Sequence, residues 1–459
     1  MNISVKLPSS FSSLATPVKY AALLTPITLT SFLLAPASGL ASASGPDLQS
    51  SLQDSPKAVL DEAWQIVHQE YVDNSFNQTN WQQTRQQLLG QEYSSRESAY
   101  DALRRALNQL NDPYTRFLSP AEYSDLTDQT SGEVSDIGIY LQKDPTTGDV
   151  FISEVLAGSP AEQSNLQAGD KLVLVDGQST TQLTIQGVSQ KLRGDEGSQV
   201  TLTISRNGGQ PRSVVVTRAR LEVATVEFLQ NTYRGRSIGY IRLLEFNAHA
   251  AEQMEEAIIS LQDQGVEGFV LDLRGNPGGL LLASIDISRM WLQHGPIVRT
   301  LDREGDDDSI SANRTALTDL PMTVLVDGRS ASSSEILTGA LQDNDRATVV
   351  GSATFGKALV QSLHGLADGS GLTVTVAHYY TPNGTDISKK GITPDVEIDL
   401  SARERRDLFN NPDLLGTESD SPYLRTAEVL TQTIASQASP LNSANGTRQL
   451  GRVASVNSN

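Results

Sequence analysis

Residues 223–400 alternate between short apolar runs and amphipathic stretches, and no other feature of the chain constrains its fold as strongly. The runs SIGYIRL, GFVLDL, PMTVLV and ATVVG have the pattern of strands, and AHAAEQMEEAIISLQDQ, LLLASIDISRMWLQ and SEILTGALQ have that of helices. Buried strands that alternate with helices are typical of a sheet with helices on its faces. The pattern therefore predicts an α/β core over residues 223–400.

The residues on either side of this core have different patterns. Helical spacing in SPKAVLDEAWQIVHQEYV and ESAYDALRRALNQL predicts an N-terminal helical domain over 44–130. From 131 to 222 the period changes to short strands, and DIGIYLQ and VFISEVL around the turn-rich KDPTTGD predict a hairpin in a compact domain. Residues 401–459 form a polar C-terminal extension, in which one helix is expected over 424–436 and the end is expected to be disordered.

The first 43 residues have the order of a signal peptide. Basic residues at Lys6 and Lys19 precede an apolar run over 21–35, and small residues follow up to Ala43. The alternative is an uncleaved membrane anchor, which the short run and Pro26 disfavour. We therefore expect an exported protein, located in a periplasm or, in a photosynthetic cell, in the thylakoid lumen.

Composition excludes several classes of function. The net charge of −19 argues against a nucleic-acid-binding surface, which needs clustered Lys and Arg. The chain has no cysteine, which excludes disulfides, thiolate catalysis and cysteine-ligated metals. The five histidines are scattered without metal-ligand spacing, so we expect neither a metal nor another cofactor.

The stretch LVDGRSASSSEILTGALQ places several hydroxyl groups between a strand that ends at Val326 and a helix that starts near Ser334. The serines are Ser330, Ser332, Ser333 and Ser334. A hydroxyl there lies at the carboxyl end of a core strand and at a helix N-terminus, which favours developing negative charge. The alternative is a helix cap, because Ser332-x-x-Glu335 has the spacing of a capping box.

Two further stretches supply partners for a nucleophilic serine. Gly278 and Gly279 end a buried strand, where backbone N–H groups can turn toward an oxyanion; a turn that needs positive φ is the alternative. Lys357 lies among apolar residues in GSATFGKALVQS, and burial lowers the pKa of a lysine toward the neutral form that a base requires. Gln361 is placed to orient its amine. A solvated surface charge is the ordinary role of a lone lysine.

The string RSASSSEILTGALQDNDRATVVGSATFGKALVQS resembles the carboxyl-terminal processing peptidases, or tail-specific proteases, which are serine peptidases with a Ser–Lys dyad. The resemblance implies that Ser332 is the nucleophile, Lys357 the base and Gln361 the residue that supports the lysine. It implies oxyanion donors at Gly278 and at the N–H of Ser333, with the choice between Gly278 and Gly279 open.

Further motifs extend the resemblance over most of the chain. NDPYTRFLSPAEY is similar to the family's helical-domain signature, and YYTPNGTDISKKGITPDVEI to its closing strands. GSPAEQSNLQAGDKLVLVDG and LRGDEGSQVTLTISRNG resemble its PDZ domain. The resemblance thus implies an α/β multidomain protein, with a crotonase-like core, a PDZ domain inserted over 131–222 and an N-terminal helical domain.

The PDZ resemblance also implies how a substrate is held. Backbone N–H groups of Ile137, Gly138 and Ile139 would receive a C-terminal carboxylate while the peptide adds as a strand. Three positions depart from the family pattern: Ala358 and Asp136 stand where glycine is usual, and Ser333 stands where alanine is usual. A carboxylate at 136 would repel a terminal carboxylate unless it points away.

We therefore expect an exported serine endopeptidase that cleaves near the C-termini of protein substrates, membrane-associated ones included. In oxygenic phototrophs, one branch of the family trims a photosystem II reaction-centre precursor; periplasmic members share the motifs, and the chain is compatible with both. The alternative is a PDZ scaffold that binds exported C-termini without cutting them. A His-triad hydrolase is disfavoured because the glycine- and serine-rich turns lack histidine. The sequence does not define the oligomeric state.

Overall fold

A six-stranded sheet lies at the centre of residues 223–400. The computed structural model describes residues 55–398 and 400–438, so the expected signal peptide and the end of the expected extension lie outside the described part. Across the sheet the strands are β10 (Val226–Tyr233), β11 (Arg236–Leu243), β12 (Gly268–Asp272), β15 (Met322–Val326), β16 (Ala347–Gly351) and β19 (Val396–Glu397). β10 is antiparallel to β11, and the other pairs are parallel. The predicted α/β architecture is confirmed.

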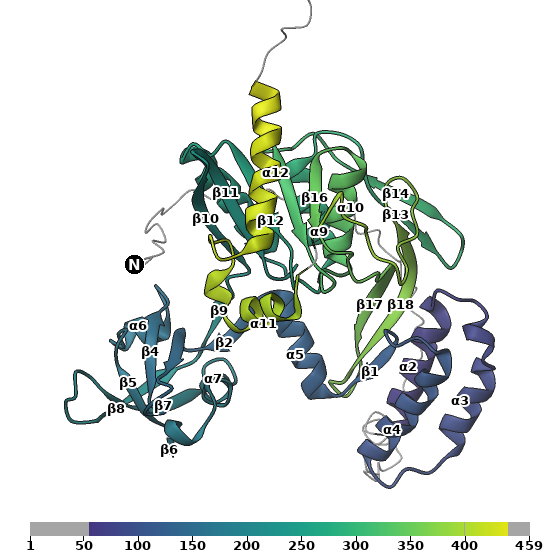
Figure 1. Cartoon of the computed structure of the whole chain (residues 1–459). Coiled ribbons are helices and arrows are strands. Elements are labelled where there is room, and N and C mark those ends of the chain that lie inside the picture. Colours follow the sequence, from purple (N-terminus) through teal and green to yellow (C-terminus); the bar gives the residue numbers. More distant parts are fainter. Residues whose placement is uncertain (1–54, 399, 439–459) are drawn as a thin grey trace, which may run out of the picture. The chain divides into compact units, whose positions relative to one another are not determined.

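Helices cover both faces of this sheet (Figure 1). One face carries α8 (Ala250–Asp263), α9 (Leu281–Trp291) and α10 (Ser333–Asp343), and the other carries α12 (Ser421–Ala438). Along β11, Ile241 and Leu243 belong to the large apolar core on the first face, while Ile238 and Tyr240 pack under α12. Every residue of β12 and β15 is buried, which explains the unbroken apolar runs in the sequence.

A second sheet adjoins the helices that precede the core in the sequence. Its strands are β1 (Arg116–Leu118), β13 (Pro296–Asp302), β14 (Asp307–Ser311), β17 (Leu359–Gly365) and β18 (Gly371–Tyr380). Leu372 and Val374 of β18 pack in one apolar cluster with α2 (Pro56–Glu70), α3 (Trp81–Gly90) and α4 (Arg96–Leu107). β1, from the segment expected to be helical, pairs with β18. Residues 116–118 are therefore built into a sheet with residues 371–373, which lie more than 250 positions later in the chain.

Residues 133–222 form a sheet of short strands with its own apolar cluster. The strands are β3 (Ile139–Lys143), β4 (Val150–Val155), β5 (Lys171–Val175), β6 (Gln178–Ser179), β7 (Gln199–Ser205) and β8 (Arg212–Thr217), with helices α6 (Pro160–Gln163) and α7 (Ile185–Leu192). The predicted hairpin is present as the antiparallel pair β3–β4. β2 (Glu133–Asp136) and β9 (Ala219–Glu222) pair at the two ends of this segment, and α5 (Pro120–Ser131) precedes β2.

A buried ion cluster fixes α12 to the central sheet. Arg274 follows β12, and its Nη2 atom lies 2.5 Å from Asp272 and 2.6 Å from Asp420, with both carboxylates fully buried. Asp420 also accepts hydrogen bonds from the N–H groups of Gly416, which precedes the helix, and Tyr423, in its first turn. The predicted helix over 424–436 is present within α12, and these contacts explain its docking.

Replacing Asp420 by alanine is expected to lower the free energy of unfolding by about 3–5 kcal/mol, because Arg274 would keep a buried charge with one partner fewer. Denaturant unfolding measures the change. Glu97→Ala removes one of three exposed acidic partners of Arg104 and should cost about 1 kcal/mol or less. Equal losses in the two variants would contradict a special role for the buried cluster.

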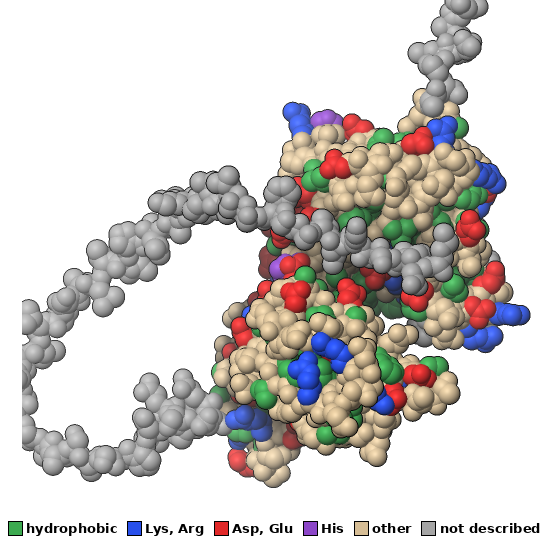
Figure 2. Space-filling view, turned by 90° about the vertical axis from the view of Figure 1, so that its left-hand side faces the viewer, with side chains coloured by type: hydrophobic (Ala, Val, Ile, Leu, Met, Phe, Trp, Pro, Cys, Tyr) green, Lys and Arg blue, Asp and Glu red, His purple; other side chains and the backbone are tan. Residues whose placement is uncertain are grey.

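Among the described residues, none of the helices combines the length and apolar character needed to cross a bilayer. On the face shown in Figure 2, acidic and basic side chains are interspersed with apolar and neutral ones. A nucleic-acid-binding surface would gather Lys and Arg on one face.

Candidate active site

The four serines after β15 differ in what their hydroxyl groups contact. Three of them bond to backbone carbonyl oxygens of the loop that follows β12: Ser330 to Leu273 (2.8 Å), Ser333 to Gly279 (3.0 Å) and Ser334 to Asn276 (3.0 Å). These bonds hold the start of α10 against that loop. The three buried serines therefore have structural roles.

Ser332 has a different environment from its neighbours. It is half-buried, and its hydroxyl takes no part in the contacts with the loop after β12. Its backbone has φ 54° and ψ −115°, a conformation that costs a non-glycine residue energy and recurs where a sharp turn presents a nucleophile. Its N–H donates to the carboxylate of Glu335 at 2.9 Å. The predicted capping box between Ser332 and Glu335 is thus present, and the Ser332 hydroxyl still makes no bond to the loop after β12.

The glycine loop lies directly against this serine. A Cβ atom on Gly278 would lie 2.7 Å from the Ala331 carbonyl oxygen, 2.8 Å from Ser332 Cβ and 3.0 Å from the nitrogen of Ser333, so only glycine fits. Ser333 is the first residue of α10, where backbone N–H groups lack intrahelical acceptors. The Gly278 N–H, in contrast, donates to Asn276 Oδ1 at 2.8 Å. Gly278 and Ser333 are thus adjacent, but the N–H of Gly278 is engaged here.

Lys357 lies between β16 and β17 and is half-buried. Burial lowers the pKa of Lys357, and the charge of Arg116 lowers it further, while Asp112 and Glu335 act in the opposite direction. Its Nζ atom lies 4.8 Å from the ring centroid of Tyr114. The hydrogen bonds found among the described residues include none between Lys357 Nζ and the Ser332 hydroxyl.

Glu335 joins the serine loop to the lysine loop. Its buried carboxylate accepts the N–H groups of Ser332 (2.9 Å), Gly356 (2.7 Å) and Lys357 (2.9 Å), and the hydroxyl of Thr354 (2.6 Å). Burial raises the pKa of Glu335, and these donors oppose the rise. The two loops are therefore held together through one side chain.

Tyr379 on β18 makes a second link between the two loops. Its hydroxyl donates to the backbone carbonyls of Ser332 (3.2 Å) and Lys357. Gln361 on β17 is half-buried, but its Nε2 atom has no hydrogen-bond partner among the described residues. The structure thus places Gln361 near the end of the lysine loop without the predicted bond to the lysine.

Sequence reasoning missed Tyr114, Tyr379 and the bridging role of Glu335. For Tyr114, the available signal was the pair of prolines in NDPYTRFLSPAEY, which break the helical pattern. Glu335 was recognised only as a member of a capping box, because spacing does not reveal which distant N–H groups a carboxylate reaches. Among the described residues there is no group of three His, Asp or Glu side chains that could hold a metal ion.

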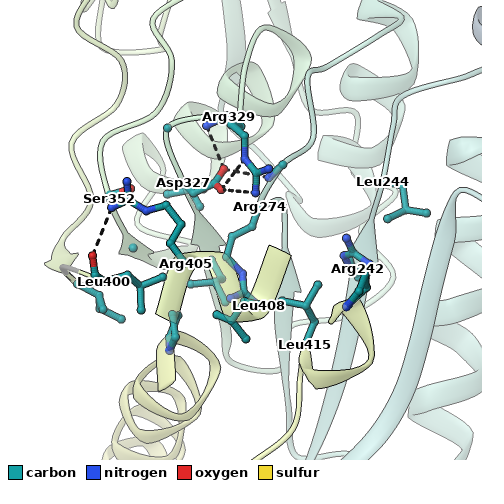
Figure 3. A pocket seen from close by; sticks show the side chains of 18 residues that line it. Arg242, Leu244, Arg274, Asp327, Arg329, Ser352, Leu400, Arg405, Leu408 and Leu415 are labelled. Carbon is teal, nitrogen blue, oxygen red and sulfur yellow. Dashed lines mark hydrogen bonds and ion pairs between the residues drawn. The ribbon is translucent and has the colours of Figure 1, made fainter. Parts of the chain in front are cut away.

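A cavity of about 630 Å³ lies beside the serine loop, at the carboxyl ends of β12, β15 and β16 (Figure 3). Arg242, Arg274, Arg329 and Arg405 line it, together with Asp327 and apolar side chains from α11 (Ala402–Asn410) and the residues after it. The Arg329 guanidinium lies 3.2 Å from Asp327. Ser332 and Lys357 are not part of its lining.

The three residues expected to receive a C-terminal carboxylate lie at the start of β3. Ile137 and Gly138 are buried, and Ile139 is half-buried. Gly138 has φ 83°, and a Cβ atom there would lie 2.4 Å from Ser159 Cβ, so this turn requires glycine.

Comparison with known proteins identifies the family. Residues 237–398 match peptidase family S41 and residues 151–206 match a PDZ domain. The "Carboxyl-terminal-processing protease" of Synechocystis sp. is 43% identical over 74% of this chain and 80% of its own length. The "C-terminal processing peptidase, chloroplastic" of Tetradesmus obliquus is 38% identical over 74% and 76%.

A solved structure agrees with these sequence matches. The photosystem II D1 C-terminal processing protease has a TM-score of 0.51 and 36% identity, over 81% of this chain and 99% of that chain. The predicted resemblance and the predicted enzyme class are confirmed. The chain belongs to peptidase family S41, the serine peptidases that include the carboxyl-terminal-processing proteases.

Proposed function

We propose that this chain is an exported endopeptidase in which Ser332 attacks the scissile carbonyl and Lys357 is the general base. One observation carries the proposal. Of the four serines, Ser332 alone has a strained backbone and a hydroxyl outside the contacts with the loop after β12, and its backbone shares Glu335 with that of Lys357. The residues are assigned to a helical domain (44–130), a PDZ domain (131–222), a core (223–400) and an extension (401–459).

The chemistry follows from the groups in place. Neutral Lys357 turns from the ring of Tyr114 toward Ser332 and takes the hydroxyl proton as the oxygen attacks. The Ser333 N–H and a glycine N–H at 278 or 279 bind the oxyanion. For Gly278 to serve, its bond to Asn276 must open, whereas Gly279 is exposed. The amine leaves with a proton from the lysine, and water then hydrolyses the acyl-enzyme.

The substrates are proteins with exposed C-termini, captured through Ile137, Gly138 and Ile139. We propose the thylakoid lumen or periplasm as the location, because similar proteins are chloroplastic or cyanobacterial. The C-terminal extension of a photosystem II reaction-centre precursor is the proposed substrate, since the similar solved structure is a photosystem II D1 processing protease. Gln361 is proposed to support the lysine when the lysine turns toward the serine.

Mass spectrometry of an unfolded test protein with an apolar C-terminus tests this function. We expect the mature enzyme to remove a short C-terminal piece, and Ser332→Ala to leave the substrate intact. Ser330→Ala is the matched control, because that buried hydroxyl is engaged with Leu273 and Asp327 and is not available to a substrate. Cleavage by a folded Ser332→Ala protein would refute the assignment, and binding without cleavage by the wild type would favour a scaffold.

A further inference from the structure

The outer edge of β3 is placed to receive a peptide strand. Across its sheet the order is β3-β4-β5-β7-β8, so β3 is an edge strand, and α7 packs beside it. An edge strand presents unpaired N–H and C=O groups to which a peptide can add. The turn at residues 136–139 precedes this edge and holds the N–H groups assigned above to a C-terminal carboxylate.

A carboxylate of the chain itself already occupies two of these donors. Asp136 Oδ1 accepts the N–H of Ile137 at 2.5 Å and that of Gly138 at 3.4 Å. These are two of the three groups that a substrate's terminal carboxylate would need. The side chain that the sequence shows in place of glycine therefore points into the site.

Like the carboxylate of a bound C-terminus, the Asp136 carboxylate lies close to positive charges. Its other oxygen, Oδ2, lies 3.9 Å from Arg193 Nε, in the residue that follows α7, and its side chain is 16% exposed. The positive charge of Arg218, between β8 and β9, also lowers the pKa of Asp136. Across the short sheet, Asp136 on β2 pairs with Ala219 on β9. Burial raises the pKa of Asp136, and the two N–H groups, Arg193 and Arg218 only partly offset the rise.

We propose that Asp136 is an internal competitor for the C-terminal-carboxylate site, and that a free C-terminus binds only when this side chain leaves the N–H groups. Proton uptake by Asp136 favours the exchange, because two carboxylates cannot share one small set of donors while both are charged. A peptide's own terminal carboxyl has a pKa of about 3.3–3.7 and stays charged in mildly acidic solution. Capture is therefore stronger at mildly acidic than at neutral pH. The inference rests on the proposed capture of C-termini.

Peptide binding to the full-length chain tests the competition. Every protein carries Ser332→Ala to prevent cleavage, and two fluorescent peptides share an apolar sequence but end in a free carboxylate or an amide. At neutral pH, Asp136→Gly should bind the carboxylate peptide at least about tenfold tighter than the parent, because a charged acceptor on free N–H groups is strongly bound. The amide peptide should gain little. Glu196→Gln, which removes an exposed carboxylate from the same domain, should change neither affinity.

The pH dependence supplies a second readout. The parent should bind the carboxylate peptide more tightly in mildly acidic than in neutral solution, while Asp136→Gly and Asp136→Asn should lose most of this difference. Asp136→Asn keeps the shape of the side chain but removes its charge. If Asp136→Gly acted only by disturbing the turn, Asp136→Asn would keep the pH dependence of the parent. Thermal unfolding confirms that each variant is folded.

The possible results separate this inference from the proposed function. Equal affinity of parent and Asp136→Gly for the carboxylate peptide would overturn the inference, even if the enzyme with Ser332 intact cleaves proteins. If none of the proteins binds either peptide while the intact enzyme cleaves, the inference fails and the peptidase assignment stands. Tighter binding by Asp136→Gly together with an inactive wild type would support the inference and count against the peptidase.

Discussion

Replacing Lys357 by methionine is expected to lower kcat/KM by about 10²- to 10⁴-fold, the range that a positioned general base contributes. Methionine fills the same apolar space but cannot take a proton from Ser332. Because burial makes the charged lysine unfavourable, the variant should be at least as stable as the wild type. Initial rates of cleavage of a C-terminal peptide measure kcat/KM, and denaturant unfolding measures the stability.

The wild-type pH profile should reveal the same group. The pKa of Lys357 lies below its ordinary value of 10.5, and the neutral base exists above that lowered pKa. Turnover should therefore rise with pH, with its midpoint below the ordinary lysine value of 10.5, and fall away in acid. Lys390→Met, which removes an exposed lysine, should keep both the rate and the profile. A profile unchanged in Lys357→Met would refute the base assignment.

Replacing Glu335 by glutamine is expected to lower kcat by about 10²-fold, a loss typical of misplaced catalytic groups. The carboxylate faces donors only, from Ser332, Thr354, Gly356 and Lys357. A glutamine would turn its own NH₂ toward some of these donors, and the serine and lysine loops would move apart. KM should change little, since Glu335 bonds to the two loops and not to the substrate.

A matched control for this substitution exists elsewhere in the chain. Glu122 forms a capping box with Ser119 at the start of α5, so Glu122→Gln makes the same chemical change away from the site. It should leave kcat unchanged. Two results would contradict the positioning role. One is a lower kcat in Glu335→Gln that is fully explained by unfolding in the assay, and the other is a raised KM with an unchanged kcat.

The core was predictable because its central strands, β12 and β15, are buried along their whole length and are therefore almost entirely apolar. The second sheet was harder to foresee, since β1 has only three residues and its pairing with β18 depends on a partner from the far end of the sequence. Local patterns carry information about strand and helix spacing. They carry little about which distant segments meet.

The candidate site shows the same division. The sharp turn at Ser332 is local, and its strand–turn–helix pattern is visible in the sequence, whereas the need for glycine at 278 comes from its close approach to residues 331–333. Asp136 was recognised as a departure from the family pattern, but the direction of its side chain could not be read from the sequence. The environment of Lys357 depends on Tyr114 and Arg116, which no local pattern connects to it.

The pairing of β1 with β18 has a consequence for the timing of activity during synthesis. Tyr114 and Arg116, which surround the amine of Lys357, come from the early part of the chain, whereas Lys357 and β18 are made late. In a half-folded chain without this pairing, Lys357 lacks the burial and the neighbouring charge of Arg116 that lower its pKa. On the proposed mechanism, the lysine therefore becomes an effective base only after β1 has paired with β18.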